Sequence, residues 1–299
     1  MKVLITGGSG LIGRSITSKL LSQNIQVAHL TRNSNSSSDV KTYEWDWEKN
    51  YLDTSCFKDV THIIHLAGAS IADKPWTMKR KRFIVKSRVH TARLLHDKIT
   101  EMNIPLKTFI SASGTGYYGA RTINKVFNES DAPYKDFISE CCVQWEESAD
   151  LFKMNSRVVK LRLGIILNKN EGALPKLSSF LKKGVGSALG SGKQYMPWIH
   201  LEDVVNLFIE CLNNNKMNGV YNAVAPNHQT NKEFTLELGK ALNKKVRVPN
   251  VPPFVLKTIY GEMADILLYG SKVSAQKIID IGYQFKYSNL NNALNDIYN

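Results

Sequence analysis

A glycine-rich segment near the N-terminus constrains the fold of this chain more than any other feature. It follows a short apolar strand predicted over Lys2–Thr6, and it satisfies the pattern G-x-G-x-x-G through Gly8, Gly10 and Gly13. Apolar residues then recur at helical spacing over residues 11–21. Between a strand and a helix, such glycines allow a tight turn and a close backbone approach to a pyrophosphate at the helix N-terminus. We therefore predict a dinucleotide site; the alternative is a glycine turn with a purely structural role. The residues expected to bind the cofactor here are Gly7, Gly8, Ser9, Gly10, Leu11, Ile12 and Gly13.

The end of the second predicted strand, residues 26–30, indicates which dinucleotide to expect. Sites selective for NAD usually place an acid there to bind the ribose 2′-hydroxyl. This chain has Thr31-Arg32-Asn33 instead. An arginine can pair with a 2′-phosphate through charge-assisted hydrogen bonds, whereas an acid would repel that phosphate. Thr31 and Arg32 therefore favour NADP(H) over NAD(H), the alternative being that Arg32 is an ordinary surface residue.

Strand and helix patterns alternate along the first half of the chain, which is typical of a parallel sheet covered by helices. We predict an α/β fold with a Rossmann doubly wound parallel sheet over residues 1–168, to which residues 200–230 return. Gly and Pro become frequent after residue 168, so residues 169–299 are expected to form a loop-rich and helical C-terminal substrate region. Further strands are predicted over residues 42–45, 60–66, 107–113, 157–163 and 219–223, and helices over 77–101, 136–153, 203–212 and 232–242.

Composition excludes several classes of protein. Hydrophobic residues make up 43% and charged residues 22% of the 299 residues, a globular mix that excludes wholesale disorder. The four cysteines show no C-x-x-C pair and no zinc spacing, so we expect neither a disulfide scaffold nor a metal site. We find no run of 18 apolar residues and no pattern of a signal peptide at the N-terminus. The expected location is therefore the cytoplasm, without membrane binding.

The chain is basic, with 39 Lys and Arg against 26 Asp and Glu and a formal net charge of +13. Much of this charge gathers in and just before the helix predicted over residues 77–101. A solvated basic face and a site for an anionic ligand are the main interpretations. We expect no nucleic-acid binding, because no helix-turn-helix, zinc finger or aromatic ribonucleoprotein motif accompanies the cluster. The cluster consists of Lys74, Lys79, Arg80, Lys81, Arg82, Lys86, Arg88 and Arg93.

Further motifs, spread over nearly the whole chain, resemble the extended short-chain dehydrogenase/reductase superfamily. The match is closest to its atypical branch of NAD-dependent epimerase/dehydratase-like "epimerase family" proteins with a DUF1731-type C-terminal segment, whose members bind NADP(H). The resemblance implies a Rossmann domain, a smaller C-terminal domain and a small-molecule substrate, and it allows a homodimer. The motifs are His65-Leu66-Ala67-Gly68, Trp76, Ser87-Arg88, residues 111–119, Trp145-Glu146, residues 161–164 and 190–194, Trp198-Ile199-His200 with Asp203, residues 261–263 and Gly282-Tyr283.

The resemblance also implies further cofactor contacts. Asp46 should lie near the adenine, and Arg88 should reach the cofactor from the basic helix. Leu66, Ala67 and Gly68 should line the adenosine side. Ser111 should pass with its neighbours beneath the nicotinamide, and Leu163 should approach the carboxamide.

The chain departs from the superfamily at its usual catalysts, a Ser or Thr with a Tyr-x-x-x-Lys pair. If Glu146 is the Glu that usually lies four residues past the Lys, Ile138 and Cys142 occupy the Tyr and Lys positions, and neither can act as an acid. Ser113 aligns with the catalytic serine if the next loop carries one extra residue. Tyr117 and Tyr118 in that loop are candidate proton donors, substrate contacts or packing residues.

Substrate-side candidates are Trp76, Lys193, Gln194 and His200, although His200 also suits a structural role. Asp203 is expected to cap the helix that follows it. Trp145, Cys141 and Cys142 are predicted packing residues. No G-x-S-x-G elbow occurs, which disfavours hydrolysis. Two functions remain open: an NADP(H)-dependent epimerase or reductase that transfers a hydride, and an NADPH-binding regulator or partner-binding module with weak or no catalysis.

Overall fold

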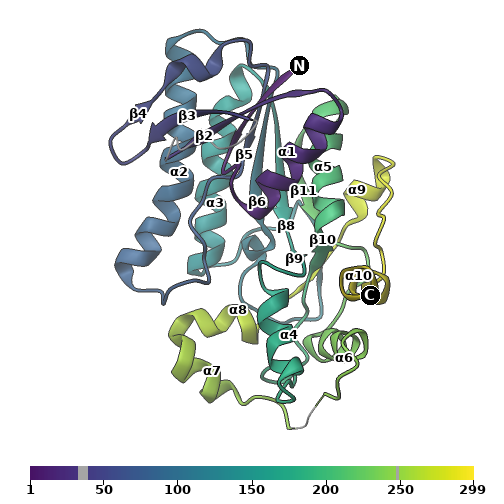
Figure 1. The fold of residues 1–299 in the computed structure, drawn as a ribbon. Helices are drawn as coiled ribbons and strands as arrows, with labels where there is room; N and C mark the ends of the chain where they lie inside the picture. The colour runs from purple at the N-terminus through teal and green to yellow at the C-terminus, as the bar shows by residue number, and fades with distance from the viewer. Residues whose placement is uncertain (33–39, 247–248) are drawn as a thin grey trace.

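A computed structural model describes residues 1–32, 40–246 and 249–299. At its centre lies an eight-stranded sheet with the order β11-β8-β6-β5-β1-β2-β3-β4 (Figure 1). Its neighbouring strands pair in parallel, except that β4 runs antiparallel to β3. This arrangement confirms the predicted doubly wound parallel sheet. The strands are β1 (Lys2–Thr6), β2 (Gln26–Thr31), β3 (Lys41–Asp46), β4 (Tyr51–Leu52), β5 (His62–His65), β6 (Thr108–Gly114), β8 (Arg157–Leu163) and β11 (Gly219–Ala223).

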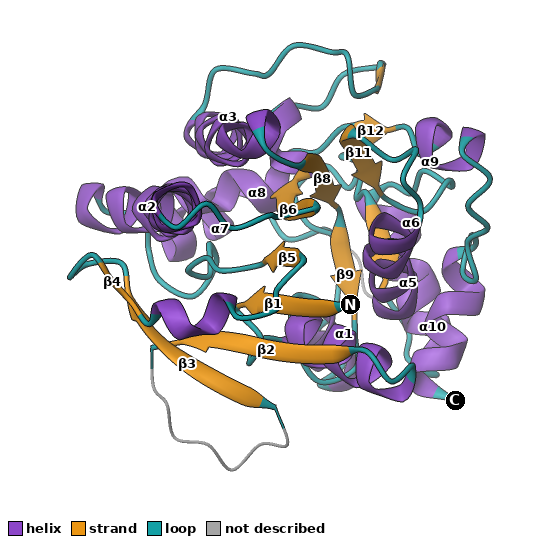
Figure 2. Ribbon diagram, turned by 90° about the horizontal axis from the view of Figure 1, so that it is seen from above, coloured by secondary structure: helices purple, strands orange, loops and turns teal. Residues whose placement is uncertain are grey.

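Two pairs of helices cover the sheet, one pair on each face (Figure 2). α1 (Leu11–Ser22) and α5 (Leu201–Asn213) lie on one face, where Ile16 of α1 and Phe208 of α5 belong to one buried cluster. α2 (Met78–Glu101) and α3 (Phe137–Asp150) lie on the other. Thr77 and Asp136 cap α2 and α3 by accepting hydrogen bonds from backbone N–H groups in the first turns.

The C-terminal region has its own buried cluster, which includes Trp198, Phe234 and Leu290. α5 and β11 belong to the central layers, as the predicted return of residues 200–230 requires, while the division at residue 168 stays a prediction. Two short parallel pairs, β9–β10 and β7–β12, lie outside the central sheet. The elements here are β7 (Val126–Phe127), β9 (Ile165–Leu167), α4 (Leu174–Lys182), β10 (Trp198–His200), α6 (Asn231–Ala241), α7 (Pro253–Tyr260), α8 (Asp265–Leu268), β12 (Lys272–Val273), α9 (Gln276–Asp280) and α10 (Leu290–Tyr298).

The expected capping role of Asp203 is wrong. His200 is the N-cap of α5, and its Nδ1 accepts from the backbone N–H of Glu202 at 3.2 Å. Asp203 is fully buried three residues later, where its carboxylate accepts from the backbone N–H groups of Lys286 (2.8 Å) and Tyr287 (3.0 Å). The carboxylate therefore anchors the C-terminal segment to α5. This segment lies more than 80 residues further along the sequence, and the capping rule does not consider such distant partners.

Among the described residues, no helix is long and apolar enough to cross a membrane. No group of three or more His, Cys, Asp or Glu side chains in the same residues is arranged to hold a metal ion. Cys141 and Cys142 are buried on α3, and burial raises the pKa of both thiols, that of Cys142 to about 12. Their placement agrees with packing.

Candidate functional site

The glycine loop joins β1 to α1, and two of its glycines allow backbone to approach backbone. Gly7 has a φ of +69°, a conformation that residues with a Cβ rarely adopt. A Cβ at Gly13 would lie 2.4 Å from the carbonyl oxygen of Gly7, so the first turn of α1 could not approach the loop. A Cβ at Gly8 would lie 2.5 Å from the His29 ring on β2. Gly10 is the N-cap of α1 and is less confined. The loop therefore forms the glycine cradle that a pyrophosphate requires.

A buried hydrogen-bond network holds the loop after β5 against β1. The Thr6 hydroxyl accepts from the backbone N–H groups of Leu66 (3.2 Å) and Ala67 (3.1 Å) and lies 2.9 Å from His65 Nδ1. Its lone pairs are thus used, so its proton is directed at Nδ1 and the His65 ring carries its proton on Nε2, 3.4 Å from the Thr91 hydroxyl. Burial lowers the pKa of His65 to about 4, which keeps the ring neutral. His65 belongs to a motif that carries the family resemblance, but the sequence predicted no role for His65, Thr6 or Thr91.

Arg88 lies beneath the same loop. Its guanidinium donates to the carbonyl oxygens of Ile84 and Ala69, both at 2.9 Å, and its Cζ lies 4.8 Å from the centre of the Trp145 ring. A Cβ at Gly68 would lie 3.0 Å from that Cζ. Arg88 is buried, and burial lowers its pKa. In this structure Arg88 braces the loop expected to line the adenosine; its direct contact with a cofactor stays a prediction.

The adenine-side candidates lie at the ends of β2 and β3. Thr31 is partly buried and Arg32 is exposed, while Asn33 lies outside the described residues. Asp46 ends β3, and its Oδ1 accepts from the backbone N–H groups of Glu48 (2.9 Å) and Lys49 (3.3 Å), so it orders the turn into β4. An exposed arginine at the carboxyl end of β2 is accessible to a 2′-phosphate.

At the carboxyl end of β6, Ser113 takes part in a buried network of charged side chains. Its hydroxyl donates to Glu146 Oε1 on α3 at 2.8 Å. Arg162 on β8 donates to the same carboxylate through Nε (2.7 Å) and through its second terminal nitrogen (2.9 Å). The side chains of Arg162 and Glu146 are 2% and 8% exposed, so this bidentate pair is screened little by water. Because Ser113 donates its proton to Glu146, its oxygen can still accept a hydrogen bond from a bound hydroxyl group.

Tyr118 belongs to the same network and is 1% exposed. Its hydroxyl donates to Asn222 Oδ1 at 2.7 Å and accepts from Arg162 at 2.9 Å. Burial raises the pKa of Tyr118 to about 12, against the lowering effect of Arg162. Tyr118 is therefore poorly suited to release a proton near neutral pH.

Tyr117 is the more accessible of the two candidate tyrosines. Its ring is partly buried and stacks on the guanidinium of Arg162, whose Cζ lies 3.3 Å from the ring centre. Within the described part of the chain its hydroxyl makes no hydrogen bond. The neighbouring Gly116 is essential here, since a Cβ would lie 2.2 Å from Ile138 Cγ2 and 3.8 Å from Cys142 Sγ. The positions aligned with the missing Tyr and Lys therefore pack against this loop.

Ser111 lies in the middle of β6, and Leu163 ends the neighbouring strand β8 opposite Gly114. Ser111 is fully buried, and its hydroxyl donates to the carbonyl oxygen of Ala112 at 2.9 Å. Leu163 is partly buried and packs against the core on one face of the sheet. The contacts of both residues with a cofactor stay predictions.

The substrate-side candidates come from different segments of the chain. Trp76 is half-buried before α2, with its ring 5.0 Å from that of Phe137 on α3 and its Nε1 donating to the carbonyl of Ile71. Gln194 is 1% exposed, and its amide nitrogen donates to the carbonyls of Leu189 (3.0 Å) and Leu267 (2.9 Å). Lys193 is exposed. Gln194 thus connects loops of the C-terminal region, and substrate binding by these residues stays a prediction.

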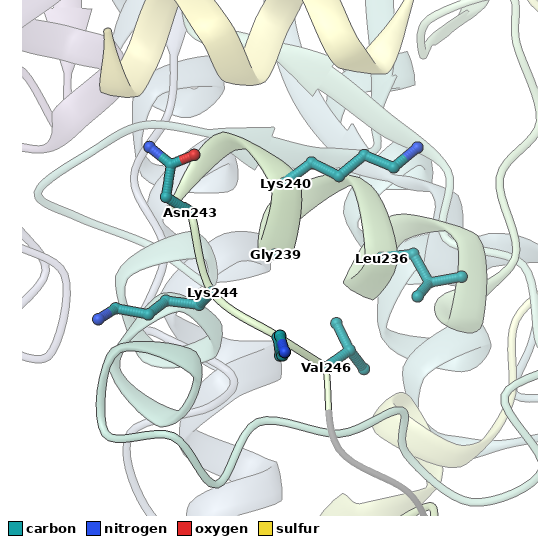
Figure 3. Close-up of a pocket in the computed structure, with 7 residues that line it drawn as sticks. Leu236, Gly239, Lys240, Asn243, Lys244 and Val246 are labelled. Carbon is teal, nitrogen blue, oxygen red and sulfur yellow. The ribbon is translucent and has the colours of Figure 1, made fainter.

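Two open surface depressions lie away from the Ser113 network. One, of about 560 Å³, lies at the C-terminal end of α6 and is lined by Leu236, Gly239, Lys240, Asn243 and Val246 among others (Figure 3). The other, of about 690 Å³, is lined by residues of α1, α5 and α10. His200 lines the second, where its Nε2 lies 3.5 Å from Asp296 Oδ2, while burial lowers its pKa. Neither lining includes Ser113 or Tyr117.

Sequence reasoning missed the role of Arg162, although one signal pointed to it. The strand Arg157–Leu163 reads RVVKLRL and is predicted to be buried, so its basic residues require partners. Lys160 donates to Asp150 at 2.6 Å and Arg162 pairs with Glu146. The pattern indicates that buried charges exist, but it does not say which carboxylates meet them.

The fold and the glycine loop together define a protein of the Rossmann type with a candidate dinucleotide site. The family model "NAD dependent epimerase/dehydratase family" matches residues 3–223, and "Domain of unknown function (DUF1731)" matches residues 251–297. The chain therefore belongs to the NAD dependent epimerase/dehydratase family.

Relatives agree with this assignment. The chain is 33% identical over 311 residues to the "Epimerase family protein SDR39U1 homolog, chloroplastic" of Arabidopsis thaliana, covering 99% of this chain and 86% of that protein. It is 32% identical to the epimerase family protein SA0724 of Staphylococcus aureus, with 98% of each covered. The crystal structure of human epimerase family protein SDR39U1 with NADPH has a TM-score of 0.89, 29% identity and coverage of 100% and 99%. A UDP-glucose 4-epimerase of Thermotoga maritima, at a TM-score of 0.81, 18% identity and coverage of 100% and 97%, shares the fold.

Proposed function

We propose that the protein binds NADP(H) on the glycine loop and transfers a hydride to or from a small carbonyl or sugar-type substrate beside Ser113. The observation that carries this proposal is the glycine cradle itself, in which Gly7 and Gly13 leave space for no side chain. The human relative was solved with NADPH, which supports the choice of cofactor. The cytoplasm is the location we propose, with no nucleic acid as a partner.

Each residue around the cradle has a proposed role. The α1 N-terminus would hold the pyrophosphate, and Arg32 would pair with the 2′-phosphate. Thr6 and Arg88 would fix the loop Leu66-Ala67-Gly68 against the adenosine side. The nicotinamide would supply or take up the hydride at its C4 position. Ser113, oriented by Glu146, would accept a hydrogen bond from the substrate hydroxyl and so hold the reacting carbon in place.

A fluorescence titration with NADPH and NADH tests the cofactor assignment. The purified protein should bind NADPH at least about tenfold more tightly than NADH, the size of one charge-assisted contact. Arg32→Ala should remove that preference, whereas Arg82→Ala, an exposed arginine on α2, should leave it unchanged. Equal affinities for the two cofactors in the unaltered protein would contradict the assignment.

One observation favours a second function: Ile138 and Cys142 occupy the positions of the usual catalytic Tyr and Lys. A protein that kept the cradle and lost its catalysts would bind NADPH as a regulator or a partner-binding module. Incubation with NADPH and a panel of ketones, aldehydes and oxidised sugars distinguishes the two. Tight binding without oxidation of NADPH by any substrate would favour the regulator; oxidation that depends on Ser113 would favour the enzyme.

A further inference from the structure

We propose that Tyr117 donates the proton in this reaction and that Arg162 positions it and stabilises its negative charge, as a lysine does beside the tyrosine of the usual pair. This inference rests on the proposed function, since it assigns the proton donor of the same site. It concerns two residues on different elements, η2 (Thr115–Tyr118) and β8, which the fold brings into contact.

The guanidinium of Arg162 is held rigidly. Each of its three nitrogens donates one hydrogen bond: Nε and one terminal nitrogen to Glu146, and the other terminal nitrogen to the Tyr118 hydroxyl at 2.9 Å. Its face remains, and the ring of Tyr117 lies against that face with 3.3 Å between Cζ and the ring centre. A cation over the face of an aromatic ring stabilises negative charge that develops on the ring. The low exposure of Arg162 strengthens this effect because little water screens it.

The backbone of Tyr117 is held as firmly as the cation. Its carbonyl oxygen accepts from the Ser139 hydroxyl at 2.6 Å and from the backbone N–H of Tyr134 at 3.2 Å. The charged and titratable groups around it are Arg162 on β8, Glu146 on α3 behind the guanidinium, and Tyr118 beside it. Glu146 lies in the guanidinium plane rather than over its face. Of the two tyrosine rings beside Arg162, that of Tyr117 lies closer to Cζ than that of Tyr118.

Tyr117 and not Tyr118 is available to a substrate. The hydroxyl of Tyr118 is committed to Asn222 and Arg162 in the interior. Tyr117 is only partly buried, and it follows Ser113 by four residues in the loop that leaves the carboxyl end of β6. The Tyr117 hydroxyl can donate to the substrate carbonyl oxygen, and the Ser113 oxygen can accept a hydrogen bond from the hydroxyl group that the reduction forms.

In the reducing direction, the carbonyl carbon of the substrate receives the hydride from NADPH, which becomes NADP⁺. The C=O bond becomes a single bond, and its oxygen takes the proton from the Tyr117 O–H bond. The Tyr117 oxygen keeps that electron pair as a phenolate beside Arg162 and is reprotonated from water. The oxidising direction reverses each transfer.

Substitution of single tyrosines tests the proton donor. With a carbonyl compound that the unaltered protein reduces, Tyr117→Phe should lower kcat by roughly 10²- to 10⁴-fold and leave NADPH affinity unchanged. Tyr51→Phe, at an exposed tyrosine on β4, should have no effect. A Tyr117→Phe variant that folds, binds NADPH and reduces the substrate within about twofold of the unaltered rate would overturn the proposal. A protein that reduces no compound would contradict the proposed function instead.

A chemical readout tests the contact with Arg162 without any substrate. Tetranitromethane nitrates tyrosine in its ionised form, and mass spectrometry locates the modified residue. Tyr117 should be nitrated faster than Tyr118, and bound NADPH should protect it. In Arg162→Gln/Glu146→Gln, which removes both buried charges together, nitration of Tyr117 should slow by roughly 3- to 30-fold. Circular dichroism confirms that this variant folds, and Lys98→Gln/Glu101→Gln is the exposed control pair. Unchanged nitration of Tyr117 in the folded double variant would overturn the role of Arg162.

Discussion

The glycine-loop edge of the sheet and the corner around Ser113 hold their functional groups by different means. At the loop, backbone approaches backbone: Gly13 faces Gly7, and Thr6 holds the N–H groups of Leu66 and Ala67. At the corner, side chain holds side chain: Ser113, Glu146, Arg162 and Tyr118 come from four elements, β6, α3, β8 and η2, and meet in the interior. A site made of backbone depends on the absence of side chains, whereas a site made of buried charges depends on every member being present.

The largest effect is expected at the corner. Arg162→Met leaves the carboxylate of Glu146 buried without its partner, which should lower the free energy of unfolding by roughly 3–5 kcal/mol. Urea unfolding followed by circular dichroism measures this. Arg162→Met/Glu146→Leu should recover most of the loss, because no unpaired charge remains. Lys98→Met, in an exposed pair with Glu101, should change stability by less than about 0.5 kcal/mol. Equal losses in the free energy of unfolding for Arg162→Met and Lys98→Met would contradict the expected difference between a buried and an exposed ion pair.

The next effect concerns the loop side and depends on pH. The pKa of His65 is lowered to about 4 in the folded chain, below its unfolded value near 6.5, so the unfolded chain binds more protons between these pH values. The stability from neutral His65 is complete above about pH 6.5 and falls as the pH drops toward 4, by roughly 3 kcal/mol. Urea titrations across this range should show a shallower fall for His65→Gln. His62, whose pKa burial also lowers to about 4, accounts for part of the remaining slope. Burial also lowers the pKa of His90, which lies at an exposed position, so His90→Gln should change the slope less than His65→Gln does.

A smaller change in stability, together with a loss of NADPH affinity, is expected for a substitution in the glycine loop. The new Cβ of Gly13→Ala lies 2.4 Å from the Gly7 carbonyl oxygen, and its accommodation should cost roughly 1–3 kcal/mol. NADPH affinity should fall by about tenfold or more, because the cradle opens. Ser18→Ala, at an exposed position on the same helix, serves as the control. Calorimetric titration with NADPH compares the two; similar losses would show that the close approach at Gly13 does not shape the site.

The smallest effect is expected at a contact between α2 and the C-terminal region of the chain. Lys81 of α2 pairs with Glu262 of η4 (Gly261–Ala264), with Nζ 2.6 Å from both carboxylate oxygens. Glu262 is 52% exposed, so Lys81→Met should lower stability by at most about 1 kcal/mol. Thermal unfolding at low and high salt measures the difference. A loss that does not shrink with added salt would mean that the ion pair with Glu262 is not the main contribution of Lys81, whose Nζ also lies 5.0 Å from the centre of the Phe137 ring.

Much of the fold and half of the site could be predicted from local patterns. The strand–loop–helix unit at the N-terminus and the alternation of strands and helices lead to the parallel sheet, because periodicity and glycine spacing are local properties. Ser113 was identified by its alignment with the catalytic serine of the superfamily. The partners of Ser113 were not: Arg162 lies 49 residues further along and Glu146 33 residues, and no local rule pairs them. The placing of Asp203 failed for the same reason, since its partners belong to the C-terminal segment.

The amino-acid sequence by itself determined the glycine turn between β1 and α1, because the close approaches at Gly7 and Gly13 require residues without a Cβ. It also determined that the usual Tyr-x-x-x-Lys pair is absent. Only the tertiary structure decided which tyrosine is free and which is committed, since Tyr117 and Tyr118 are neighbours with the same chemistry. Successive residues of the loop face different surroundings, so one hydroxyl is buried with Asn222 and the other ring lies on the face of Arg162. Buried charge pairs form between distant elements, and their partners are therefore chosen by packing rather than by spacing.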